Sequence, residues 1–264
     1  MKGKYLLGIG ILIIIMVTLF LLVENLNFAG ENLPEENEEI KEKSEAEEPK
    51  NENKNKNHTE KPEKDLRDLR EIMEEQALKY PDTFFVEGPD LEKRIALTFD
   101  DGPDEVNTPK ILDILAKNNV RATFFLLGEN VERHPEIVKR IKKEGHQLGN
   151  HSWSHPNFRE MESNIVIDKE IIPTSERINK ATGEFPRLLR PPFGAINDQT
   201  IEILKEKNWK IVNWSIDSYD WNIPQSNYYE IVSRIQRLHH LGGIILLHNN
   251  INNKSTVKAL PELI

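Results

Sequence analysis

Residues 94–103, RIALTFDDGP, join a short apolar run to two carboxylates and a turn. The run up to Asp100 predicts a β-strand, and Asp-Asp-Gly-Pro favours a turn directly after it. Further strands are predicted at residues 122–128, 146–151, 188–192, 210–217 and 243–248, with helices near 109–117, 135–144, 165–181, 198–207 and 228–241. This alternation predicts an α/β fold in which helices cover a parallel sheet, either doubly wound or closed into a barrel.

Polar residues interrupt the apolar pattern at the carboxyl ends of the predicted strands. In chain order they are Asp100, Asp101, His151, His155, Arg190, Asp217, Asp220 and His248. In a β/α barrel, the carboxyl ends of the strands form the face on which catalytic groups converge. Any one of these residues has an ordinary structural explanation, but their joint placement indicates an active site.

Two of these residues form a metal-binding pattern. His151 and His155 are four residues apart, so one helical turn can aim both imidazoles at the same cation. Two histidines and one carboxylate give a divalent ion three protein ligands and leave a position open for water. Asp100 or Asp101 can supply the carboxylate, since neighbouring side chains at a strand end point in different directions. We expect one divalent metal ion, zinc first, with cobalt, nickel or manganese as alternatives.

The composition excludes several other classes of protein. The 264 residues contain 35 Lys and Arg, 44 Asp and Glu and no cysteine, for a net charge of −9. The absence of cysteine rules out disulfides, thiol nucleophiles and Cys-ligated zinc. An acidic chain also argues against nucleic-acid binding, because phosphate backbones require clustered cations.

Five motifs, in this order along the chain, resemble those of the polysaccharide deacetylase family, carbohydrate esterase family four, which shares the NodB homology domain. They are Thr98-Phe-Asp-Asp-Gly-Pro103, His151-Ser-Trp-Ser-His155, Arg190-Pro-Pro-Phe193, Asp217-Ser-Tyr-Asp-Trp221 and Leu246-Leu-His248. The resemblance spans roughly residues 94–260 and implies a distorted (β/α)7 barrel. The family includes peptidoglycan N-acetylglucosamine deacetylases, chitin deacetylases and acetylxylan esterases.

The resemblance also implies a role for each residue at a matching position. Three residues would hold the metal, namely Asp101, His151 and His155. Four would act in catalysis, namely Asp100 as general base, Arg190 orienting it, His248 as general acid and Asp220 behind that histidine.

The same resemblance implies a substrate pocket for the acetyl group. Its residues would be Phe193, Trp221 and Leu246, with the backbone N–H of Phe193 directed at the oxyanion. The chain departs from the family pattern at two places. Relatives usually have Tyr where this chain has Phe193. The segment Asn249-Asn250-Ile-Asn-Asn-Lys254 replaces the Asp that commonly follows the last-motif histidine.

The N-terminal region predicts a tethered protein. Residues 5–23 form an uncharged run that is long enough to span a bilayer. Because Lys2 and Lys4 precede this run, residues 1–4 should stay in the cytoplasm. An uncleaved anchor is favoured over a cleaved signal peptide, whose apolar region is shorter. Residues 24–65 predict a disordered, charged linker, residues 66–89 a helix and lead-in segment, and residues 90–264 an extracellular catalytic domain.

The expected function is metal-dependent hydrolytic removal of acetyl groups from N-acetylglucosamine in a cell-wall polysaccharide. Peptidoglycan in a Gram-positive envelope is the first candidate substrate. Chitin-like polymers, exopolysaccharides and xylan esters are alternatives within the same chemistry. We expect the protein to interact with this polysaccharide and with the membrane, and not with nucleic acid. We also expect it to be a monomer.

The C-terminal end raises a different class of function. The chain ends at Ala-Leu-Pro-Glu-Leu-Ile264, about where the last helix of the family begins. We therefore expect the last helix-strand unit to be lacking and the sheet edge beside the first predicted strand to be exposed. This expectation keeps open a catalytically impaired, glycan-binding pseudoenzyme. A membrane scaffold built on the acidic linker is a third class, which leaves the five motifs unexplained.

Overall fold

The computed structural model describes residues 60–90, 93–222 and 226–264, with side chains described from residue 68 onward. The strands are β1 (Phe84–Phe85), β2 (Ala96–Gly102), β3 (Thr123–Leu126), β4 (Gln147–Asn150), β5 (Leu188–Leu189), β6 (Lys210–Val212), β7 (Ile216–Asp217) and β8 (Ile244–His248). The α-helices are α2 (Glu60–Lys79), α3 (Asn107–Lys117), α4 (Gly128–Arg133), α5 (Pro135–Lys143), α6 (Ser163–Ile165), α7 (Ile172–Thr182), α8 (Asp198–Glu206), α9 (Tyr228–Leu238) and α10 (Lys254–Leu263). A π-helical turn, η1 (Val166–Ile171), joins α6 to α7, and a 3₁₀ turn, η2 (Pro192–Gly194), follows β5.

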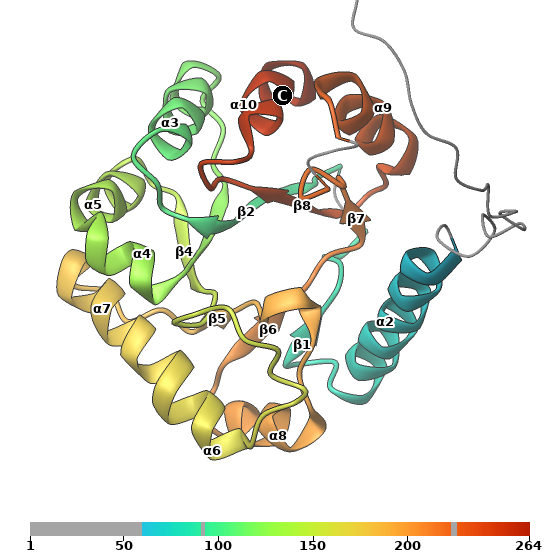
Figure 1. Ribbon diagram of the computed structural model, residues 1–264, viewed down its shortest axis with the longest axis vertical. Coiled ribbons are helices and arrows are strands. Elements are labelled where there is room, and N and C mark those ends of the chain that lie inside the picture. The colour runs from blue at the N-terminus through green and yellow to red at the C-terminus, as the bar shows by residue number, and fades with distance from the viewer. Residues whose placement is uncertain (1–59, 91–92, 223–225) are drawn as a thin grey trace, which may run out of the picture. The chain divides into compact units, whose positions relative to one another are not determined.

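All the described strand pairs are parallel and belong to one sheet, in the order β1-β6-β5-β4-β3-β2-β8-β7. The sheet curls, and helices surround it on the outside (Figure 1). Its described edge strands, β1 and β7, do not pair with each other, so the predicted barrel is a curled, open sheet. The predicted parallel α/β architecture with outer helices is confirmed.

One predicted strand, residues 210–217, is two strands. β6 pairs with β1 and β5, whereas β7 pairs with β8 at the opposite edge of the sheet. The connecting residues make separate bonds to each side, since the Asn213 N–H donates to Phe85 O (2.8 Å) and the Ser215 N–H to Ile244 O (3.2 Å). The segment between β6 and β7 therefore crosses from one side of the open sheet to the other. In a closed barrel the two edge strands would be paired. The pattern of apolar residues continues through this segment, which is why the sequence predicts one strand.

The C-terminal expectation is wrong for the helix and for the sheet edge, although no strand follows α10 among the described residues. β2 lies between β3 and β8, so neither side of the first predicted strand is an exposed edge. Helix α10 follows β8 and buries Ala259 and Leu260 in the core that also contains residues of α3 and α9. The turn after β8 is five residues long, from Asn249 to Asn253, and the helix that was expected to be lacking begins at Lys254.

The N-terminal boundary also differs from the prediction. Helix α2 begins at Glu60, inside the segment predicted as a linker. It buries Met73 and Gln76, and the Gln76 side-chain amide donates to Ile196 O (2.9 Å). In the part of the chain that the structure describes, no helix is both long enough and apolar enough to cross a membrane. The predicted anchor, residues 5–23, lies outside the described residues.

Two apolar cores support the sheet. One contains Phe99 and Phe124, whose rings stack 5.2 Å apart, and residues of the helices on that side. The other surrounds Phe84 and Trp209 beside α2 and α8. Both cores lie between the sheet and the helices, so their apolar side chains do not fill the carboxyl ends of the strands. Polar side chains can therefore gather at those ends.

Candidate active site

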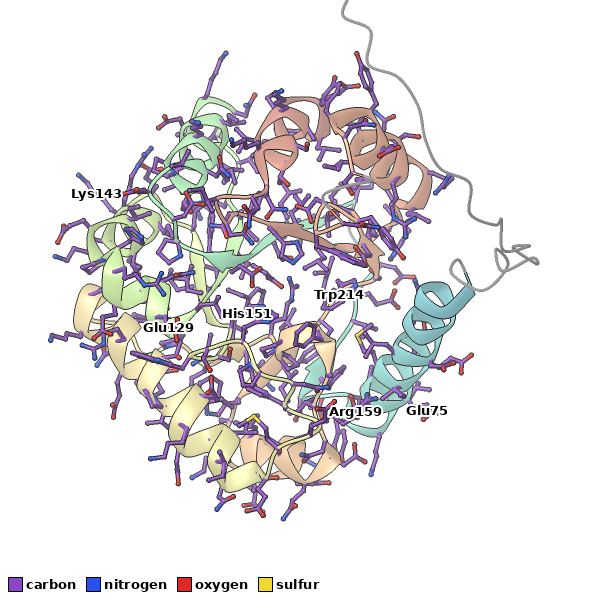
Figure 2. All side chains as sticks on the ribbon, viewed as in Figure 1. Glu75, Glu129, Lys143, His151, Arg159 and Trp214 are labelled. Carbon is purple, nitrogen blue, oxygen red and sulfur yellow. The ribbon has the colours of Figure 1, made fainter. Side chains whose placement is uncertain are left out.

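The parallel strands bring the predicted site residues to one edge of the sheet. Asp100 and Asp101 lie near the end of β2, His151 directly follows β4, and Arg190 directly follows β5. His248 is the last residue of β8. His151 lies near the middle of the ring of helices (Figure 2). The topology thus brings residues that are far apart in the sequence together in one cluster.

Three side chains form a group that can hold a metal ion. The ligand atoms of Asp101, His151 and His155 all lie within 4.8 Å of one another. Both histidine Nε2 atoms are 3.5 Å from Asp101 Oδ1. That oxygen is buried and has no hydrogen-bond partner among the described residues. A buried acceptor without a donor is costly, so the arrangement fits a divalent cation between the three ligands.

Neighbouring groups prepare the ligands for a cation. His151 Nδ1 lies 2.7 Å from the carbonyl oxygen of Arg190 and must donate to it, which leaves the Nε2 lone pair for the metal. Burial, followed by the charge of His151, lowers the pKa of His155 and favours its neutral form. Burial raises the pKa of Asp101, but the histidines around it, His151 first and then His248 and His155, hold it well below its usual range. A neutral His155 and an ionised Asp101 are the forms that metal binding requires.

Two asparagines orient Asp101. Asn250 Nδ2 donates to Oδ2 of Asp101 (3.1 Å), and Asn130 Nδ2 donates to its backbone carbonyl oxygen (2.6 Å). Asp101 has a left-handed φ of 71°, a backbone conformation that is uncommon outside glycine but that Asp adopts more readily than most residues. Asn250 lies in the segment that departs from the family pattern. Its amide donates a hydrogen bond to Asp101, whereas a carboxylate at this position would repel it.

Asp100 lies beside a buried cation. Arg190 is 0% exposed, and its Nη1 donates to Asp100 Oδ1 at 2.9 Å. The other carboxylate oxygen, Oδ2, is 3.7 Å from His151 Nε2. Burial lowers the pKa of the Arg190 guanidinium, and Asp100 opposes that effect. The Arg190 guanidinium thus orients the Asp100 carboxylate toward the metal-ligand cluster.

His248 lies in a second carboxylate–imidazole pair. Its Nδ1 is 2.7 Å from Asp220 Oδ1, and its backbone N–H donates to Asp220 Oδ2 (2.8 Å). Thr256 Oγ1 in α10 also donates to Asp220 Oδ2 (2.6 Å). Burial lowers the pKa of His248, but Asp220, with smaller contributions from Asp101 and Asp100, raises it to about 9. The imidazole is therefore protonated at neutral pH and can act as a proton donor.

The three predicted pocket residues differ in accessibility. Phe193 is 56% exposed and meets the His155 ring edge-on, with ring centroids 4.6 Å apart. Trp221 is 40% exposed, and its indole N–H donates to Asp217 Oδ1 (3.2 Å). Leu246 is buried in β8, which leaves little of its side chain for a ligand. Of the three side chains, Phe193 and Trp221 therefore have the larger accessible apolar surface.

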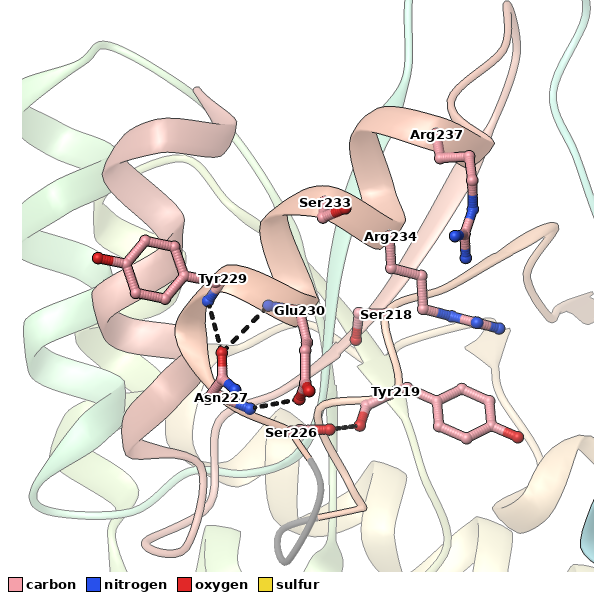
Figure 3. A pocket seen from close by; sticks show the side chains of 9 residues that line it. All are labelled: Ser218, Tyr219, Ser226, Asn227, Tyr229, Glu230, Ser233, Arg234 and Arg237. Atoms are coloured by element: carbon pink, nitrogen blue, oxygen red, sulfur yellow. Dashed lines mark hydrogen bonds between the residues drawn. The ribbon is translucent and has the colours of Figure 1, made fainter. Parts of the chain in front are cut away.

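A separate cavity of about 650 Å³ lies beside the fourth motif, between Ser218–Tyr219 and helix α9 (Figure 3). Arg234 extends along it, donates to the carbonyl oxygen of Asp217 (2.7 Å) and lies 4.3 Å from the centre of the Tyr219 ring. None of the three metal ligands lines this cavity. It is a solvated surface depression and does not contain the reacting groups.

Sequence reasoning missed the residues that support the site. They are Thr98, Asn130, Glu170, Asn250 and Thr256. Asn250 is the one that carried a signal, as a departure from the family pattern. The others make their contacts across 16 to 92 residues of sequence, so no local spacing indicates them.

The family follows from the fold, the cluster and the comparisons together. Residues 87–212 match the family model for polysaccharide deacetylase. A crystal structure of a peptidoglycan N-acetylglucosamine deacetylase, in complex with 4-naphthalen-1-yl-N-oxidanyl-benzamide, is 41% identical with a TM-score of 0.65. The match covers 67% of this chain and 83% of that chain. The chain belongs to the polysaccharide deacetylase family.

Two curated relatives are peptidoglycan N-acetylglucosamine deacetylases. The protein from Bacillus cereus is 42% identical over 179 residues, which is 67% of this chain and 64% of the relative. The protein from Listeria monocytogenes is 41% identical over 168 residues, which is 64% of this chain and 34% of the relative. The match therefore spans less than two thirds of the length of either relative.

The three-ligand cluster predicts that zinc stabilises the fold. With free zinc at 100 times its dissociation constant, binding should add about 2.7 kcal/mol to the free energy of unfolding, because only the folded state assembles the ligands. His155→Ala should lose most of this gain, whereas His239→Ala, which changes an exposed histidine, should keep it. Thermal unfolding with and without zinc measures the effect. An equal zinc-dependent rise in Tm for both variants would contradict the assigned ligands.

The Asp220–His248 pair predicts a shifted titration. Asp220→Asn removes the charge that favours the imidazolium, so the pKa of His248 should fall by about 1–3 pH units. NMR titration of the His248 ring measures this value. Glu262→Gln, which removes an exposed charge on α10, should leave it unchanged. If Asp220→Asn also leaves the pKa of His248 unchanged, the interaction is not the cause of its high value.

Proposed function

We propose that this protein removes acetyl groups from N-acetylglucosamine residues of peptidoglycan. The observation that carries the proposal is the cluster of Asp101, His151 and His155, in which a buried Asp101 oxygen lacks a donor. Both curated relatives described above are named as peptidoglycan N-acetylglucosamine deacetylases, at 42% and 41% identity. Chitin-like polymers, exopolysaccharides and xylan esters are the alternative substrates for the same chemistry.

Asp101, His151 and His155 would hold one divalent ion, and we propose zinc. A bound metal ion would supply Lewis acidity that polarises the acetamide carbonyl and makes water easier to deprotonate. The ligand set leaves room for a water or substrate oxygen, as in other sites with three protein ligands. Cobalt, nickel and manganese also accept two imidazoles and a carboxylate.

Asp100 and His248 would move the protons. Asp100, oriented by the buried Arg190 guanidinium, would accept a proton from the water that attacks the acetyl carbon. His248, which Asp220 keeps protonated, would donate a proton to the nitrogen as the carbon–nitrogen bond breaks. The new carbon–oxygen bond yields acetate, and the sugar retains a free amine. The two proton-transfer groups differ in charge because one contacts a cation and the other a carboxylate.

The remaining site residues would recognise the acetyl group. The backbone N–H of Phe193 would stabilise the negative charge that develops on the carbonyl oxygen. Trp221 and Leu246 would border the acetyl methyl group, with Trp221 offering the larger accessible surface.

We also propose that the protein is a single-pass membrane protein whose catalytic domain faces the outside of a Gram-positive-type cell. Residues 1–4 would be cytoplasmic, residues 5–23 the anchor and the charged segment after them a tether. Lys2 and Lys4 before the apolar run support this orientation. The monomer would reach peptidoglycan without a further subunit.

Acetate release tests the activity. The full-length protein in detergent should release acetate from peptidoglycan, and a chelator should abolish the release. Asp100→Asn should lower kcat by about 10²–10⁴-fold, because the variant has no general base. Asp168→Asn, an exposed carboxylate on η1, is the matched control and should keep wild-type kcat.

The substrate panel separates the alternatives. Chitooligosaccharide and acetylated xylan should release less acetate than peptidoglycan under the same conditions. No release from any of these polymers by the zinc-loaded protein would reject the enzyme and favour the glycan-binding pseudoenzyme.

Protease treatment of intact cells tests the orientation. An outward-facing domain should be digested while a cytoplasmic marker protein survives. Complete survival of the domain, with digestion only after lysis, would contradict the proposed topology.

A further inference from the structure

The loop that carries the two histidine ligands is held by an unusual set of hydrogen bonds. The backbone N–H groups of residues 152–155 all donate to side-chain oxygens. Asn150 Oδ1 accepts from Ser152 (2.8 Å), and Ser152 Oγ accepts from His155 (2.9 Å). Ser152 and His155 have left-handed φ values of 79° and 65°. Such conformations are costly for residues other than glycine, so the loop depends on these bonds to keep its shape.

Glu170 accepts the two central N–H groups. Its Oε2 accepts from Trp153 N (2.8 Å) and Ser154 N (2.9 Å), and its Oε1 accepts from Ser154 Oγ (3.0 Å). Glu170 is 7% exposed, and no Lys or Arg among the described side chains forms an ion pair with it. Its carboxylate is therefore satisfied by the loop itself. Hydrogen bonds to an ionised acceptor are stronger than neutral ones, so the loop is firmly held.

The helix that carries Glu170 is built to reach the loop. Glu170 lies in the π-helical turn η1, and such turns are rare and frequent at functional sites. The next residue, Ile171, accepts a bond from Asn150 Nδ2 through its carbonyl oxygen (2.7 Å). Asn150 directly precedes His151, so η1 contacts the chain on both sides of the first histidine ligand.

Helix α4 closes the opposite side of the loop. The N–H of Gly128 donates to Ser152 O (2.9 Å), and the N–H of Glu129 donates to Trp153 O (3.3 Å). A Cβ at Gly128 would lie 2.3 Å from the Trp153 ring, so this close approach requires glycine. The loop is thus fixed by α4 through its carbonyl groups and by Glu170 through its N–H groups. Of these contacts, Glu170 alone contributes a charged side chain.

We propose that Glu170 is a positioning residue of the metal site. It holds the loop in the one shape that directs His155 toward His151 and Asp101, so a divalent transition metal binds without first reorganising the loop. The residue touches neither the metal ligands' imidazoles nor the substrate pocket. The inference rests on the proposed function only for the presence of the metal.

Zinc affinity of the full-length protein in detergent tests the proposal. Glu170→Gln removes the charge and one acceptor oxygen, and should weaken zinc binding by about 10–100-fold, as measured by competition with a chromophoric chelator. The visible spectrum of the cobalt-loaded variant should also change, because the imidazole of His155 is less well oriented. Glu176→Gln is the matched control, since it makes the same charge change at an exposed position of α7.

A merely structural role gives a different result. In that case Glu170→Gln would lower the Tm of the metal-free protein but keep the zinc affinity and the cobalt spectrum of wild type, which would overturn the proposal. Equal weakening in Glu176→Gln would overturn it as well. If Glu170→Gln does not fold, Ser154→Ala decides, because it removes only the bond to Oε1. A weaker zinc affinity in Ser154→Ala supports the proposal, and an unchanged affinity and spectrum reject it.

Acetate release is not a readout in this experiment. A protein that binds zinc through Glu170-dependent ligands but deacetylates no polymer would refute the proposed activity and leave the role of Glu170 intact. Conversely, if the protein deacetylates its substrate fully and Glu170→Gln leaves the zinc affinity unchanged, only the positioning role is refuted.

Discussion

The site depends on the hydrogen bonds that the guanidinium of Arg190 donates. The guanidinium is fully buried and donates to Asp100 and Thr98 on β2, and to the carbonyl oxygens of Val212 and Asn213. It therefore joins the middle of the sheet to the point where the chain leaves β6. The carbonyl oxygen of Arg190 also fixes the His151 ring. Removing one partner of such a buried pair typically costs about 3–5 kcal/mol, because the other charge is left without compensation.

Two adjacent carboxylates acquire different tasks from their surroundings. Asp100 faces the Arg190 cation, whereas Asp101 faces two imidazoles and leaves one oxygen without a donor. The left-handed backbone at Asp101 separates the directions of the two side chains. Like charges so close would normally disfavour joint ionisation. Here a fixed cation neutralises one of them, and a bound metal ion would neutralise the other.

The turn after β8 and helix α10 complete the site as well as the core. Asn250 donates to Asp101, and Asn253 Nδ2 donates to the backbone carbonyl oxygen of Asp220 (3.0 Å). Thr256, in the first turn of α10, donates to the Asp220 carboxylate that pairs with His248. The segment that looked too short from the sequence therefore connects both halves of the candidate catalytic machinery.

Local patterns in the sequence are enough to predict the class of fold and to locate the chemical groups along the chain. Alternating strands and helices, with Asp, His and Arg at the strand ends, indicate a parallel sheet with one polar edge, because both periodicity and turn chemistry are local properties. The five ordered motifs, His151-Ser-Trp-Ser-His155 among them, indicated the family. Only the tertiary structure decided how those groups are held. Glu170 binds a loop 16–17 residues away, Asn250 binds Asp101 across 149 residues, and the chain crosses between sheet edges at Asn213–Ser215. Such contacts depend on how elements pack in space, and no pattern along the chain encodes them.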